Sequence, residues 1–130
     1  MLKIDMHTHI LPKTMPNWTE KFGYGKFIHL EANDDGSANM MQGGNFFRRI
    51  VENCWDEELR IKEYADYHTQ VQVVCTIPVM FSYWAKTADC AELSRFLNDH
   101  IADLVQRFPK NYIGLGTIPM QDRSEEHTSE

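Results

Sequence analysis

Three segments of the chain have the hydrophobic pattern of β-strands. The run Val71–Ile77 is rich in β-branched residues and ends at Pro78, and Tyr112–Ile118 is a second run of this kind. A shorter alternation of apolar and polar residues over Leu2–Met6 predicts a strand near the start of the chain. The sequence therefore predicts three strands that are far apart along the chain.

Two helices are predicted between these strands. Apolar residues from Ala88 to Phe108 recur three and four positions apart, which predicts an amphipathic helix that stops at Pro109. A shorter helix is expected after Asp56, whose side chain can cap it, and it continues to Ala65. Strands that alternate with helices favour a parallel sheet with right-handed crossovers. An open doubly wound sheet and part of a (β/α)₈ barrel both satisfy this pattern.

A different pattern fills the stretch between the first strand and the first helix. Alternating runs between Lys26 and Val51 are interrupted by Asn33–Gly36 and again by Gly43–Gly44. The first interruption is a good hairpin turn, because Asp-Gly tolerates positive φ. We interpret this stretch as a small β-insertion, at about residues 13–55, that is not part of the main scaffold.

Composition narrows the classes of function. The 130 residues are enough for one domain with a hydrophobic core, and the net charge of −6 disfavours nucleic acid or an acidic membrane as a partner. No apolar run approaches the roughly 20 residues that span a bilayer, and the first residues lack a signal-peptide pattern. The three cysteines form no Cys-x-x-Cys pair, so we expect a reducing, cytosolic location.

The motif with the clearest chemistry is Asp5-Met6-His7-Thr8-His9. Residues i and i+2 of a strand point to the same face, so His7 and His9 are expected to project together from the end of the first strand. Two imidazoles on one face suit a divalent metal such as zinc. By itself, a His-x-His pair is equally compatible with two unrelated histidines.

Two adjacent arginines, Arg48 and Arg49, follow the glycines of the insertion and the apolar pair Phe46 and Phe47. An arginine can hold a carboxylate through two parallel, charge-assisted hydrogen bonds. A solvated surface arginine is the commoner case, and composition does not distinguish these two interpretations.

Five blocks of sequence carry a resemblance to a known family: Lys3–Lys13, Phe22–Gly25, Glu52–Asp56, Pro78–Lys86 and Gly114–Gln121. In their order and spacing they resemble the aminocarboxymuconate-semialdehyde decarboxylases of the metal-dependent amidohydrolase superfamily. The resemblance extends over nearly all of residues 1–121. Together these blocks are far more specific than the histidine pair alone.

The resemblance implies both a fold and an activity. The implied fold is α/β, the N-terminal part of a (β/α)₈ TIM barrel over residues 1–121 with a small β-insertion after the first strand. His7 and His9 are implied as zinc ligands, and Arg48, but not Arg49, as the residue that binds a carboxylate of a small-molecule substrate. The implied reaction is the non-oxidative decarboxylation of 2-amino-3-carboxymuconate 6-semialdehyde in tryptophan catabolism, the kynurenine pathway. The full-length parent is expected to be a cytosolic homodimer.

Several parts of this family's machinery are not assigned to any residue of the chain. A complete barrel typically needs about 250 residues. By resemblance, the remaining zinc ligands, a histidine and an aspartate, and a further catalytic histidine come from later strands. We therefore expect a zinc-dependent carboxy-lyase in the full-length parent and an inactive, truncated chain here.

The last residues of the chain do not resemble the family. Arg123–Glu130 match the translation of a common sequencing-library adapter, and we expect residues 122–130 to be a non-native tail.

Two other functions remain open at this point. One is a different decarboxylase or hydrolase of the same superfamily, and the other is an inactive fragment that acts only as an interaction module.

Overall fold

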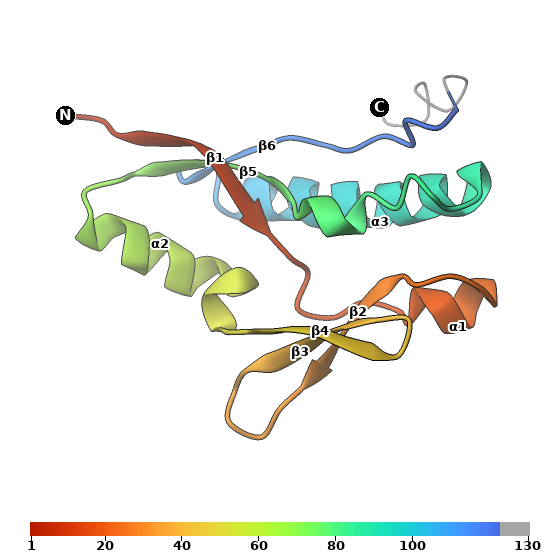
Figure 1. Ribbon diagram of the computed structural model, residues 1–130. Helices are drawn as coiled ribbons and strands as arrows, with labels where there is room; N and C mark the ends of the chain where they lie inside the picture. The colour runs from red at the N-terminus through yellow and green to blue at the C-terminus, as the bar shows by residue number, and fades with distance from the viewer. Residues whose placement is uncertain (123–130) are drawn as a thin grey trace.

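The computed structural model describes residues 1–122, which form two separate three-stranded sheets joined by helices. Figure 1 shows the parallel strands in the upper part of the view and the antiparallel sheet below them. The strands are β1 (Ile4–Ile10), β2 (Ile28–Ala32), β3 (Ala38–Gln42), β4 (Asn45–Ile50), β5 (Val71–Thr76) and β6 (Tyr112–Gly114). The helices are α1 (Trp18–Phe22), α2 (Glu57–Asp66) and α3 (Thr87–Arg107), with short 3-10 helices η1 (Glu52–Cys54) and η2 (Pro78–Met80).

The first sheet has the order β1–β5–β6 and all of its strands are parallel. α2 precedes β5 and α3 joins β5 to β6, which confirms the predicted alternation of strands and helices and the α/β class. Asp56 caps α2 as predicted, because its side chain accepts a hydrogen bond of 2.9 Å from the Leu59 N–H.

Both long helices pack on the same face of the parallel sheet. Ile10 and Val74 form a buried cluster with Leu104 of α3 on this packed face. The alternate positions point the other way, and there Ile4 and Ile113 are 42% and 49% exposed. Within residues 1–122 no element covers this second side, which we call the uncovered face.

The second sheet is an antiparallel meander in the order β2–β3–β4. Its first connection is the predicted turn, in which Asn33 N–H donates to the Ser37 carbonyl and Gly36 has φ of +86°. Met40 and Ile50 of the meander are buried in a core that also contains Leu93 of α3. An antiparallel meander therefore lies in the stretch where the sequence predicted a small β-insertion, and α3 contributes to the cores under both sheets.

β1 is longer than the sequence predicted. A strand was expected over Leu2–Met6, but the strand runs from Ile4 to Ile10 and contains a bulge between Asp5 and Thr8. The bulge shifts the alternation of side chains by one residue. The second half of the strand therefore does not continue the period-two pattern of the first half, and the sequence pattern did not predict it. The histidine pair consequently lies within the C-terminal half of β1.

β6 is shorter than predicted, since it ends at Gly114 and not at Ile118. The reason lies in α3, where the Asn98 side-chain amide donates to the Thr117 carbonyl and its oxygen accepts from the Thr117 N–H, at 2.9 and 2.8 Å. The backbone N–H and carbonyl of Thr117 are thus hydrogen-bonded to a side chain of α3 and not to a neighbouring strand.

α1 was not expected, because Pro12 and Pro16 indicated irregular structure. Asn17 caps this helix by accepting from the Glu20 N–H at 3.2 Å. The Asn-x-x-Glu spacing at these positions is a helix-start signal of the capping-box type, and it identifies α1 in retrospect.

The (β/α)₈ barrel stays a prediction, since the described strands form an open parallel sheet beside the meander. The expected non-native tail, apart from Asp122, lies outside the described residues. No helix in residues 1–122 combines the length and the apolar character that crossing a membrane requires.

Candidate functional site

The two histidines of β1 lie side by side. The ring centroids of His7 and His9 are 4.7 Å apart and their planes are at 86°. His9 Nδ1 lies 3.2 Å from the carbonyl oxygen of Thr76 and 3.2 Å from Cys75 Sγ. In the tautomer in which Nδ1–H donates to that carbonyl, Nε2 keeps its lone pair for a metal. The pair therefore fits as two of the ligands of a zinc ion.

Other potential ligands do not complete the site. Within residues 1–122 no group of three histidine, cysteine or acidic side chains is arranged to hold a metal. Cys75 is next to His9, but burial raises the pKa of its thiol and so disfavours the thiolate that binds metals. A catalytic zinc usually has three protein ligands, so the described residues supply part of such a set.

A cavity of about 440 Å³ brings the end of β1 together with the meander. His9 and Arg48 both line it, although they are far apart in the sequence and belong to different sheets. Arg49, Arg60 and Tyr64 line the same cavity, whereas His7 does not.

The charges around this cavity suit an anion. Three arginines, Arg48, Arg49 and Arg60, are among its lining residues, and Glu63 is the one acidic residue among the lining residues that the structure describes. The Glu63 carboxylate already accepts a hydrogen bond of 3.2 Å from Asn53. The cavity is thus lined by positive groups although the whole chain has a formal net charge of −6. A carboxylate entering it would be stabilised by positive charge, and most directly by an arginine whose donors are not already engaged.

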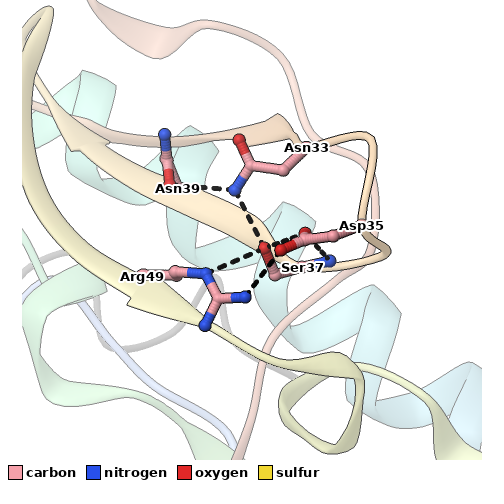
Figure 2. Close-up of polar contacts among 5 residues, drawn as sticks. All are labelled: Asn33, Asp35, Ser37, Asn39 and Arg49. Atoms are coloured by element: carbon pink, nitrogen blue, oxygen red, sulfur yellow. Dashed lines mark hydrogen bonds and ion pairs between the residues drawn. The ribbon is translucent and has the colours of Figure 1, made fainter.

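Arg48 and Arg49 are adjacent in β4 but differ in their contacts. Figure 2 shows Arg49 directed toward the β2–β3 turn, where it donates to Ser37 Oγ at 3.1 Å and to Asp35 Oδ2 at 2.7 Å. Hydrogen bonds from Ser37, and then from Arg49, hold the pKa of Asp35 well below its usual range. Arg49 is therefore occupied in holding the turn.

Arg48 is exposed, and its guanidinium lies 5.8 Å from the centroid of the Phe47 ring. It forms no ion pair with an acidic residue in the described part of the chain. Of the two arginines, Arg48 is the one whose donors are available for a substrate carboxylate, which agrees with its assignment from the resemblance. Its role stays a prediction.

The sequence analysis missed a buried polar network behind the histidines. Arg60 is 7% exposed, and its Nη2 donates to Thr8 Oγ1 at 2.7 Å and to Gln72 Oε1 at 2.9 Å. The hydroxyl of Tyr64, one helical turn further along α2, donates to Asp5 Oδ2 at 2.9 Å. The available signal was the i, i+4 spacing of these two α2 residues, which places them on one helix face.

Comparison with known proteins gives a consistent set of relatives. The chain is 52% identical over 120 residues to a protein of Dictyostelium discoideum named 2-amino-3-carboxymuconate-6-semialdehyde decarboxylase, a match over 92% of this chain and 33% of that protein. A Caenorhabditis elegans protein of the same name is 46% identical over 120 residues, which is 92% of this chain and 30% of that protein. The chain thus spans about a third of the length of these curated relatives. No family model matches the chain.

A comparison with solved structures identifies a protein of similar fold. A crystal structure from Staphylococcus aureus, of a protein described as an amidohydrolase, superimposes with a TM-score of 0.62 over 99% of this chain and 32% of that protein. The sequence identity is 14%, so this likeness concerns the fold alone.

Proposed function

We propose that this chain, a homologue of proteins named 2-amino-3-carboxymuconate-6-semialdehyde decarboxylase, contributes the metal-binding strand and the carboxylate-binding arginine of a metal-dependent decarboxylase. The proposed substrate is the semialdehyde for which these relatives are named, a small molecule with carboxylate groups. The tryptophan-degradation context, the cytosolic location and the homodimer that the resemblance implies for the full-length parent remain part of this proposal.

One observation carries the proposal. His9, which the family resemblance implies as a zinc ligand, and Arg48, which it implies as the carboxylate-binding residue, line one cavity of about 440 Å³. The two residues come from different sheets, and their meeting at one cavity is not a consequence of nearness in sequence. A metal-dependent decarboxylase needs a metal ligand and a group that binds the substrate carboxylate on either side of one substrate. His9 and Arg48 could fill these two roles in one cavity.

In this proposal, different residues of the chain bind the metal and the substrate. His7 and His9 hold the metal through ring nitrogens on one face of β1, and the Thr76 carbonyl orients the His9 ring. Arg48 binds a carboxylate of the substrate and fixes its distance from β1. When bound there, a zinc ion would supply Lewis-acid chemistry and proton exchange near neutral pH.

The adjacent arginines provide a matched test. In a full-length polypeptide that includes these residues, Arg48→Ala is expected to keep its metal and to raise the KM for the semialdehyde about 10- to 100-fold, because a charge-assisted hydrogen bond is lost. Arg49→Ala, at the turn-bound neighbour, is expected to leave the KM within about twofold of the unsubstituted enzyme, since its loss affects exposed turn contacts. Steady-state kinetics and metal analysis measure both. If Arg48→Ala leaves the kinetics unchanged, the carboxylate site lies elsewhere, with Arg49 the first candidate.

For the 130-residue chain by itself, two observations favour the alternative of an inactive fragment that acts only as an interaction module. The described residues hold two of the expected ligands and no group of three, and the uncovered face of the parallel sheet exposes apolar side chains. We propose that this chain alone has no decarboxylase activity. Metal-dependent turnover of the semialdehyde by the isolated chain would contradict this.

A further inference from the structure

We infer that Tyr64 and Arg60 are positioning residues that hold the bulge of β1 and thereby set the histidine pair on the uncovered face. This inference rests on the proposed metal-binding function of His7 and His9. Its physical basis is the buried network of hydrogen bonds between α2 and β1, to which the family resemblance assigns no role.

β1 contains one more residue than the segment of β5 with which it pairs. Asp5 pairs with Gln72 and Thr8 pairs with Val74, so three steps along β1 match two steps along β5 and one residue of β1 is extra. Asp5 and Thr8 therefore face the same side of the sheet, the packed face. In a regular strand, strict alternation would place Asp5 on the same face as the two histidines. The bulge thus reverses the alternation between Asp5 and Thr8, the stretch that contains His7.

One side chain of α2 contacts β1 on both sides of the bulge. The Tyr64 hydroxyl donates to Asp5 Oδ2 at 2.9 Å and lies 3.4 Å from Thr8 Oγ1, so a single group touches the residues on both sides of the irregularity. The other oxygen of Asp5 accepts a hydrogen bond of 3.1 Å from the N–H of His7, inside the bulge. Tyr64 is therefore connected to the backbone of a candidate ligand through one carboxylate.

Arg60 hydrogen-bonds to residues on both strands of the β1–β5 pair. Its Nη2 bonds to Thr8 and to Gln72, which is the β5 partner of Asp5, and its Nη1 donates to the Asn53 carbonyl at 2.9 Å. Nε is buried and has no hydrogen-bond partner within residues 1–122. A buried guanidinium held by neutral oxygens is costly for stability, and such groups are kept in some proteins because they specify one arrangement. Here the arrangement specified is the register of β1 on β5.

The test compares two tyrosines of the same segment. Tyr64→Phe removes the hydroxyl that spans the bulge and keeps the ring, whereas Tyr67→Phe removes the hydroxyl of a side chain that is 77% exposed. The imidazole ¹H–¹⁵N signals of His7 and His9 are followed in a full-length polypeptide that includes these residues, during titration with Zn²⁺ alone. Tyr64→Phe is expected to weaken Zn²⁺ binding about 10- to 100-fold, as loss of an outer-shell partner does, and Tyr67→Phe to leave it unchanged.

A second variant separates positioning from general loss of structure. Thr8→Val removes the hydroxyl that Arg60 and Tyr64 contact and keeps a β-branched side chain, and it is expected to weaken Zn²⁺ binding in the same way. Equal Zn²⁺ affinity in Tyr64→Phe, Thr8→Val and the unsubstituted chain would overturn the inference and leave the proposed metal site standing. Failure of the unsubstituted chain to show Zn²⁺-dependent shifts at either histidine would instead reject the proposed metal site, and the inference with it. Weakened binding by Tyr67→Phe as well would show a general structural effect and would also overturn the inference.

Discussion

The two sheets of this protein differ in the sequence distance that their pairing must bridge. In the meander, Ala32 pairs with Ala38 across a short turn. In the parallel sheet, His9 pairs with Cys75, and the whole meander and α2 lie between them in the sequence. Local pairing is set by turn residues, whereas distant pairing depends on what packs between the strands. The candidate site needs both sheets, because it combines a histidine of one with an arginine of the other.

The sheets also differ in what holds them. The meander turn is fixed by polar contacts among Asp35, Ser37 and Arg49 (Figure 2), of which the Arg49–Asp35 ion pair is exposed. The parallel sheet is fixed on its packed face by the apolar cluster around Leu104 and by the buried network of Arg60. Substitutions in the parallel sheet should therefore have large effects, and substitutions in the turn should have small ones.

The largest expected effect is at the histidines of the parallel sheet. We expect the double substitution His7→Ala, His9→Ala to abolish Zn²⁺ binding at this site, because both ring nitrogens that fit the metal are removed. Equilibrium dialysis with metal analysis measures the stoichiometry. The control is His68→Asn, since His68 lies outside the site and has φ of 61°, which asparagine tolerates. An unchanged zinc stoichiometry in the double variant would reject the assignment.

The next effect concerns the core beneath the parallel sheet. Leu104 is fully buried, and Leu104→Ala is expected to lower the free energy of unfolding by about 2–5 kcal/mol because it leaves a cavity. Gln106→Ala, at an exposed position of the same helix, is expected to change it by less than about 0.5 kcal/mol. Since α3 contributes to the cores under both sheets, amide hydrogen exchange should accelerate in both. Faster exchange confined to the parallel sheet would show that the sheets unfold separately.

A smaller effect is expected at α2, the helix whose Arg60 and Tyr64 contact β1. Asp56→Ala removes the side-chain cap on the Leu59 N–H and should destabilise the protein by about 1 kcal/mol. Asp66→Ala, which removes an equal charge at the other end of the same helix, is the matched control and should not destabilise. Urea denaturation compares the two, and equal destabilisation would show that charge, and not the cap, is responsible.

The smallest effect is expected in the exposed turn of the meander. The lowered pKa of Asp35 means that its carboxylate stabilises the folded state above its unfolded pKa of about 3.9, and that this contribution is lost as the pH falls below that value. Asp35→Asn should therefore flatten the dependence of stability on pH in the acid range, whereas Asp34→Asn should leave it unchanged. Thermal unfolding between pH 2 and pH 6 provides the measurement. Parallel curves for Asp35→Asn and the unsubstituted chain would contradict the assigned role.

The features that the sequence determined are those with a local cause. The run Val71–Thr76 is a strand because its β-branched residues favour extended backbone, and α3 follows from apolar residues at helical spacing. The Asp-Gly turn and the Asp56 cap likewise depend on residues a few positions apart. The motif around His7 and His9 and the family blocks indicated the candidate chemistry, and the relatives bear the name of the family so indicated.

Only the tertiary structure decided the bulge in β1, the end of β6 and the meeting of His9 with Arg48. Each depends on partners that are distant in the sequence: Tyr64 at the bulge, Asn98 beside Thr117, and the two separate sheets around one cavity. A period-two pattern in the sequence predicts that side chains alternate between the two faces of a strand. It does not predict where a bulge against the partner strand shifts that alternation. The sequence therefore determined which side chains could act, and packing between distant segments decided which of them face one another.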